Sequence, residues 1–219
     1  MEPFKISNHL RNVVGAYPQA ELIINAGKEG GEAARHAIAR QWLSEGIPYA
    51  FKDCPGVYES VRYWVATRLS VDPKEVNITG SGRLGQSLAP QKIGKVFGDG
   101  SDLDIFIISG ELFEKLKHEF NDWSFDFESN KLNPSNDRER GFWESNLHRV
   151  PKNLGRGFID TKLIPNHEKY KNTRSIAQTM FLLKEKLSVT PQAPKISEAS
   201  VRCYKSWSSY VQQVSLGLQ

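Results

Sequence analysis

The chain has 219 residues, of which 39% are hydrophobic and 25% charged, and its 29 Lys and Arg against 25 Asp and Glu give a net charge of +4. This composition is typical of a globular protein with a substantial core, and it excludes a low-complexity or largely disordered chain. The mild positive charge suits contact with polyphosphates or nucleic acids. The chain shows no long apolar run and no signal-peptide profile, and its two cysteines share no paired spacing, so we expect a cytoplasmic protein without membrane contact.

Helices are expected in the first 70 residues. From Glu32 to Glu45 the apolar residues recur at helical spacing, and the run ends at Gly46-Ile47-Pro48. A second helix is predicted from Pro55 to Ser70, because Pro55 suits a first helical turn and apolar residues line one face. Residues 1–70 are therefore predicted to form a helical segment that packs on the core that follows.

The middle of the chain contains the first predicted strands. Val76 to Thr79 is predicted as a short strand, and Leu103 to Ile108 as a buried one because its last residues are continuously apolar. A helix from Glu111 to Phe120 and a strand from Trp123 to Phe127 are expected next. Residues 129–157, rich in Asn, Pro, Gly and basic side chains, are predicted to form a loop-and-helix insertion.

The last third of the chain is expected to begin with a strand and to end in helices. Gly157 to Pro165 alternates as a strand does, whereas residues 173–187 and 197–216 are predicted to be helical. The predicted fold class is therefore α+β, with a small mixed β-sheet core at 71–165 that carries the insertion. The N-terminal segment and C-terminal helices at 166–219 would flank this core.

The segment Gly80-Ser81-Gly82-Arg83-Leu84-Gly85 is a candidate phosphate cradle. Glycines let backbone N–H groups approach a phosphate, the Ser81 hydroxyl adds a donor, and Arg83 is a further candidate for phosphate contact. A dinucleotide-binding fingerprint has the same glycine spacing but needs a crossover helix next, for which the prolines and glycines of residues 90–100 leave little room. The alternative without a ligand is a tight turn between a strand and a short helix.

Asp102 and Asp104 open the next predicted strand. Side chains alternate along a strand, so both carboxylates project from the same side. At a separation of about 4 Å and an effective dielectric of about 20 they would repel by roughly 4 kcal/mol, which favours a divalent cation between them. The alternative is a solvated pair at a strand end.

The glycine-serine turn followed by Ser-Asp-x-Asp resembles the nucleotidyltransferase superfamily of the DNA polymerase β type. The resemblance covers residues 76–108, and within the superfamily the chain is similar to small stand-alone bacterial members that work in phage defence. It implies an enzyme dependent on Mg²⁺ or Mn²⁺ that transfers a nucleoside monophosphate from an NTP to an acceptor hydroxyl and releases pyrophosphate. The resemblance also implies that Gly80 and Ser81 bind the triphosphate. The chain departs from larger relatives in having no long helical acceptor domain, and its loop at 86–99 is longer than in minimal members.

A third carboxylate from another strand normally completes such a two-metal site. Asp160 is the preferred candidate because it is an acid in an otherwise apolar strand, where Lys162 would share its face and bind nucleotide. Asp126 is the competing candidate. The resemblance favours Asp160 as the residue that activates the nucleophile. Asp102, Asp104 and Asp160 are thus the expected metal-binding and catalytic residues.

The acceptor is left open among a nucleotide, a nucleic-acid end and a protein hydroxyl. The basic insertion at 129–157 is the candidate surface for contacting it. A hypothesis from a different class is a non-catalytic nucleotide-binding module that regulates a partner toxin or effector protein. The intact glycine turn and acid pair favour the enzyme.

Overall fold

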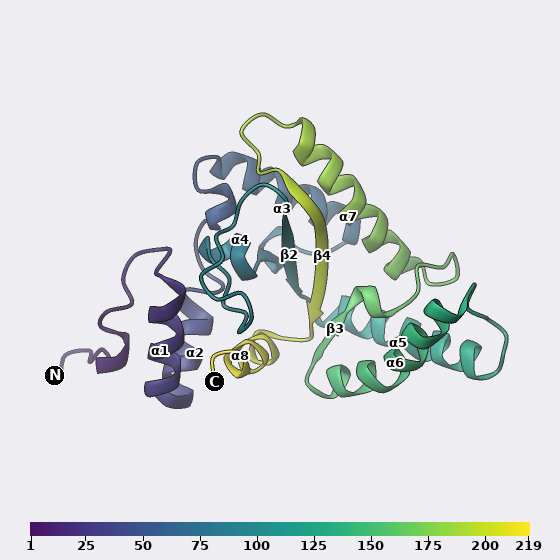
Figure 1. The fold of residues 1–219 in the computed structure, drawn as a ribbon, viewed down its shortest axis with the longest axis horizontal. Helices are drawn as coiled ribbons and strands as arrows, with labels where there is room; N and C mark the ends of the chain where they lie inside the picture. Colours follow the sequence, from purple (N-terminus) through teal and green to yellow (C-terminus); the bar gives the residue numbers. More distant parts are fainter.

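Four strands form one mixed sheet in the computed structural model, which describes residues 1–219 (Figure 1). Their order across the sheet is β1 (Val76–Ile78), β2 (Ser101–Ile108), β4 (Ile196–Tyr204) and β3 (Phe158–Asp160). β2 and β4 run parallel, and the two short outer strands are antiparallel to their neighbours. The surrounding helices are α1 (Ala20–Glu29), α2 (Gly31–Gln41), α3 (Pro55–Leu69), α4 (Gly80–Leu84), α5 (Gly110–Glu128), α6 (Asp137–Gly155), α7 (Lys171–Val189) and α8 (Trp207–Leu216). The predicted α+β class is therefore confirmed.

The two faces of the sheet have different surroundings. Leu103, Ile105 and Ile107 of β2 face the main apolar core, to which α3, α5 and α7 contribute. On the opposite face Phe106 stacks on Tyr210 of α8, with ring centroids 4.1 Å apart. In Figure 1 α8 lies at the carboxyl end of β4, so it covers this face only there. The amino-terminal half of β2 on this face stays open to solvent.

The N-terminal helices pack in two places. α1 and α2 form a second, smaller apolar cluster with Leu84 of α4 and Leu218 near the chain end, whereas α3 joins the main core. The predicted helices at Glu32–Glu45 and Pro55–Ser70 are confirmed as α2 and α3, although α2 ends at Gln41. α1 was not predicted. None of the helices combines the length and apolar character needed to span a lipid bilayer.

The prediction of a continuous helix over residues 197–216 is wrong. Ile196–Tyr204 forms β4, and only Trp207 onward is helical. Ala199, Val201 and Cys203 alternate into the core, and β4 pairs with β2 on one edge and β3 on the other. The segment 166–219 therefore contributes an inner strand as well as helices, and the sheet core extends beyond residue 165.

The predicted strand at Trp123–Phe127 is also wrong, because α5 continues through it to Glu128. Trp123 packs on Phe120 and Phe127, with ring centroids 5.6 Å and 6.0 Å away, which is the contact pattern of one helix face. Phe125, which would share the face of Trp123 in a strand, is 59% exposed. The loop-and-helix insertion is confirmed as a loop followed by α6.

Candidate active site

The glycine turn between β1 and α4 lies directly against β2. The Thr79 N–H donates to the Asp104 carbonyl at 2.9 Å, which continues the β1–β2 pairing up to the turn. Gly80 has a φ of +63°, and a Cβ at this position would lie 3.3 Å from Asp104 Oδ2. Glycine is favoured here both by the left-handed backbone and by the adjacent carboxylate. The turn and the acid therefore belong to one site.

Asp102 and Asp104 project from the open face of β2. Both are exposed, whereas Leu103 between them is fully buried, as strand alternation requires. Two serines of β4 hold them: the Ser197 hydroxyl donates to Asp102 Oδ1 at 2.5 Å, and the Ser200 hydroxyl donates to Asp104 Oδ1 at 2.7 Å. Each carboxylate is thus oriented through one oxygen and keeps the other oxygen for a ligand.

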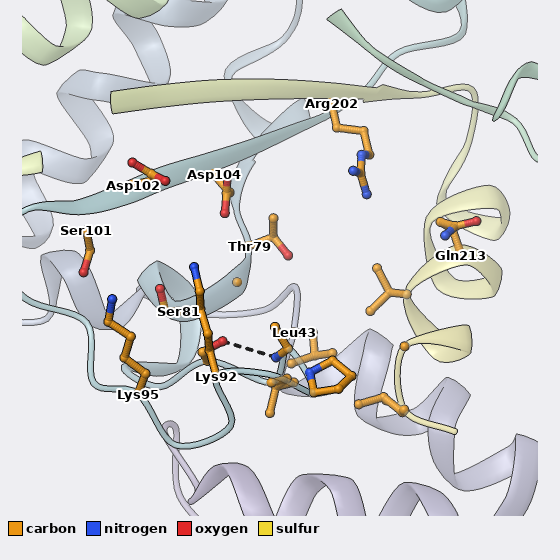
Figure 2. Close-up of a pocket in the computed structure, with 18 of the residues that line it drawn as sticks. Leu43, Thr79, Ser81, Lys92, Lys95, Ser101, Asp102, Asp104, Arg202 and Gln213 are labelled. Atoms are coloured by element: carbon orange, nitrogen blue, oxygen red, sulfur yellow. Dashed lines mark hydrogen bonds between the residues drawn. The ribbon is translucent and has the colours of Figure 1, made fainter. Parts of the chain in front are cut away.

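The turn and the acid pair line a cleft of about 560 Å³. Lys92 and Lys95, from the loop after α4, extend across this cleft toward Ser81 and the acids (Figure 2). The loop is closed at its base by a β-bridge between Gln86 and Val96. The sequence prediction omitted both lysines, although two cations in a glycine-rich loop between the two motifs were a usable signal. Cations facing carboxylates across a cleft suit a phosphate ligand bound together with a divalent cation.

Asp160 is not brought together with the acid pair. β4 separates β3 from β2, and the register places Asp160 beside Arg202 but Asp104 beside Ser200. A strand spacing of about 4.8 Å and a rise of about 3.3 Å per residue put the Cα atoms of Asp104 and Asp160 roughly 12 Å apart. Asp160 Oδ2 instead accepts a hydrogen bond from Arg202 Nη2 at 3.1 Å. The expected three-carboxylate cage does not form, because the inner strand carries serine and arginine next to the pair.

Asp126, the competing third carboxylate, lies on α5 and faces the start of α7. It accepts hydrogen bonds from the Lys169 ammonium and, at 2.9 Å, from the Tyr170 hydroxyl. The hydrogen bond from Lys169 holds the pKa of Asp126 below its ordinary value, although burial acts in the opposite direction. Asp126 therefore connects two helices and takes no part in the cleft.

Arg83 does not contact the cleft. Its side chain is buried, and it donates from Nε to the Trp42 carbonyl at 3.0 Å and from Nη1 to the Ile47 carbonyl at 2.6 Å. Burial lowers the pKa of its guanidinium. The predicted role of Arg83 in phosphate contact is wrong, because the side chain joins α4 to the segment after α2.

Lys162 also lies elsewhere than predicted. β3 ends at Asp160, and a 3₁₀ turn over Thr161–Leu163 carries Lys162 away from the open face. Its Nζ lies 2.7 Å from Glu198 Oε1, and both residues line a second cavity of about 490 Å³ bounded by α6, α7 and β4. Lys162 therefore does not share a site with Asp160.

The acid pair fits one part of a magnesium site. Mg²⁺ is commonly bound through one or two carboxylates and completes its shell with water and substrate phosphates. Asp102 and Asp104 match this pattern, and no third His, Cys, Asp or Glu side chain is placed to form a metal-binding group with them. The residues present fit a single ion shared with a phosphate, and they do not fit a three-carboxylate site for two ions.

No protein-family model, curated protein or solved structure matches the chain. The cleft is therefore interpreted from its own chemistry. Its elements are a glycine turn with a serine hydroxyl, a carboxylate pair oriented by two serines, and two lysines on the facing loop.

Proposed function

We propose that the chain is a magnesium-dependent nucleotidyltransferase of the DNA polymerase β type, which moves a nucleoside monophosphate from an NTP to an acceptor hydroxyl. The observation that supports this best is the contact between the glycine turn and the acid pair. Gly80 lies so close to Asp104 Oδ2 that a Cβ would be 3.3 Å from it. A phosphate held by the backbone N–H groups of the turn would therefore lie beside the carboxylates.

The residues of the cleft would have separate roles in the reaction. The turn and the Ser81 hydroxyl bind the triphosphate, while Lys92 and Lys95 offset its charge and that of the departing pyrophosphate. Asp102 and Asp104 would hold Mg²⁺, which when bound polarises the phosphate and stabilises its developing negative charge. Positioning and charge neutralisation are the main demands of phosphoryl transfer, and this set of residues supplies both.

In the proposed transfer, the acceptor oxygen forms a bond to the α-phosphorus. The bond from that phosphorus to the oxygen bridging to the β-phosphate breaks, and pyrophosphate leaves. The hydroxyl proton passes to a carboxylate of the acid pair, because Asp160 is held by Arg202 outside the reach of this centre.

Asp104→Asn tests the proposal. Asparagine preserves the shape of the side chain and an acceptor for the Ser200 hydroxyl, but it removes the negative charge. With each NTP and Mg²⁺, we expect the variant to release pyrophosphate about 100-fold more slowly or less than the wild type does. Asp122→Asn, which neutralises an exposed aspartate of α5, is the matched control and should keep full activity. Equal pyrophosphate release from the two variants would refute the role of the acid pair.

One observation favours a second candidate, a nucleotide-binding module without turnover. The position beside Asp104 on β4 is Ser200, so the site lacks the third carboxylate that the superfamily resemblance implies. Under this alternative the wild type binds NTP and releases no pyrophosphate. Mass spectrometry of the same incubations separates the candidates, because a modified nucleotide, an extended oligonucleotide or a modified protein also identifies the acceptor class.

A further inference from the structure

Arg202 reaches the cleft from β4, a segment that the sequence predicted to be helical and that supplied no predicted site residue. It lies on β4, two positions beyond Ser200, which is the partner of Asp104. Its side chain extends from β4 into the cleft on the same face as Asp104 (Figure 2). From strand spacing and rise, the Cα atoms of Arg202 and Asp104 are about 8 Å apart, so one phosphate chain can contact both residues.

Two residues of β3 fix the guanidinium group. Asp160 Oδ2 accepts from Arg202 Nη2 at 3.1 Å, and the guanidinium carbon lies 5.0 Å from the centre of the Phe158 ring. The side chains of Arg202 and Asp160 are 42% and 30% exposed, so the pair is open to a ligand. A guanidinium has five N–H donors, and Asp160 uses only one of them.

Hydrogen-bonding capacity is unused at this end of the cleft. Arg202 Nε is buried without a partner, and so is Oε1 of Gln213, a residue of α8 that lines the same cleft. Buried polar atoms in folded proteins are nearly always paired. Arg202 Nε is a donor that a phosphate oxygen can satisfy, whereas the Gln213 oxygen is an acceptor that a phosphate cannot satisfy, so only the unpaired Arg202 atom supports a phosphate ligand here.

We infer that Arg202 is a phosphate-binding residue of the cleft and that Asp160 is its positioning residue, not a metal ligand. The inference rests on the proposed function for the identity of the ligand, which is the polyphosphate of an NTP. The planar guanidinium fork matches two oxygens of one phosphate. Held by Asp160, it supplies fixed positive charge beside a site whose carboxylates suit a single ion.

The first test measures binding of tripolyphosphate by isothermal titration calorimetry, with EDTA present so that no divalent ion takes part. We expect Arg202→Gln to weaken binding about 10-fold or more, since a charge-assisted contact is lost. Arg202→Lys keeps the charge but not the planar fork, so its tripolyphosphate affinity should lie between those of the wild type and Arg202→Gln. It also provides the test if Arg202→Gln fails to fold. Lys28→Gln removes an exposed charge of α1 as a control for net charge. The inference is overturned if the wild type binds no tripolyphosphate or if both Arg202 variants bind it as the wild type does.

The second test measures Mn²⁺ affinity by electron paramagnetic resonance without nucleotide. The Mn²⁺ affinity of Asp160→Asn should stay within about twofold of the wild-type value, because Asp160 is not a ligand. The Mn²⁺ affinity of Asp104→Asn should fall about 10-fold or more. A loss in Asp160→Asn as large as that in Asp104→Asn would make Asp160 a metal ligand and overturn the inference.

The positioning role has its own readout, the coupling between the two residues. Asp160→Asn should weaken tripolyphosphate binding about threefold or more in the wild-type background and leave it unchanged in the Arg202→Gln background. Additive losses in the double variant would show that Asp160 acts independently of Arg202, against the inference.

None of these measurements uses turnover, so failure of the inference and failure of the proposed function are distinguishable. If Arg202→Gln loses tripolyphosphate while the wild type releases no pyrophosphate from any NTP, the phosphate-binding role stands and the transferase function fails. If the wild type turns over NTP while both Arg202 variants keep full tripolyphosphate affinity, the transferase function stands and the role of Arg202 fails.

Discussion

Arg83→Met replaces a buried cation by an apolar side chain of similar length. The change removes the donors to the Trp42 and Ile47 carbonyls, which Arg83 contacts at 3.0 Å and 2.6 Å. The Trp42 carbonyl is then left without a partner, which costs about 1–3 kcal/mol. The Ile47 carbonyl keeps a hydrogen bond from the Tyr17 hydroxyl at 2.9 Å, so only the net value of one hydrogen bond, about 1 kcal/mol, is lost there. Relief from burying the guanidinium offsets part of this total, and we therefore expect a loss of about 2 kcal/mol in the free energy of unfolding.

For a chain of this size, about 1 kcal/mol corresponds to about 2–4 °C in Tm, so Arg83→Met should lower Tm by roughly 4–8 °C. Thermal unfolding followed by circular dichroism measures this. ATP affinity, measured by calorimetry on folded protein, should stay at the wild-type value, because Arg83 does not line the cleft.

Lys92→Met is the matched control, since it removes one positive charge from an exposed residue that does line the cleft. It should leave Tm unchanged and weaken ATP binding about 10-fold. The reasoning would be refuted if Arg83→Met melted like the wild type and bound ATP more weakly, since Arg83 would then be a ligand contact and not a structural one.

Three further outcomes are expected. Gly80→Ala and Gly15→Ala, at φ values of +63° and +77°, should each lose about 1–2 kcal/mol of unfolding free energy, measured in urea. Only Gly80→Ala should also weaken Mn²⁺ binding, because its Cβ would lie 3.3 Å from Asp104 Oδ2, whereas a Cβ at Gly15 would meet no atom. Equal Mn²⁺ affinities of the two variants would contradict this. The hydrogen bond from Lys169 lowers the pKa of Asp126 below its ordinary 3.8. The ionised Asp126 therefore contributes its full stabilisation at pH values above 3.8, and this stabilisation is lost as the pH falls toward the folded-state pKa. Asp126→Asn should flatten this acid limb in urea unfolding measured across pH, and an unchanged acid slope would count against the pairing. Burial raises the pKa of the Cys203 thiol to about 12, so the native protein should not react there with thiol reagents at neutral pH, whereas the denatured chain should.

The parts of the site that the sequence predicted correctly depend on neighbouring residues. The strand before Gly80, the turn itself and the strand that begins near Asp102 all have local signals: a glycine pattern and a continuous apolar run. Because β1 and β2 pair directly, the turn and the acids were close once both strands were recognised.

The parts that it missed depend on an inner strand with polar residues. Arg202 lines the cleft, and Ser197 and Ser200 donate to its acid pair. Because β4 carries these polar residues among its apolar ones, the segment was interpreted as a helix. Without that strand, the order of the sheet was unknown, and Asp160 was assigned to the acid pair. Lys162 was misplaced for a related reason, because β3 ends at Asp160 before reaching it.

The sequence by itself determined the α+β class and the candidate turn and acid pair, since local backbone preferences and side-chain alternation act over a few residues. Only the tertiary structure decided which side chains meet across strands. Inserting β4 between β2 and β3 moves Asp160 away from the acids and places Arg202 in the cleft. The packing of α4 against the segment after α2 buries Arg83. Such placements depend on strand order and register, which are fixed by contacts between residues far apart in the chain.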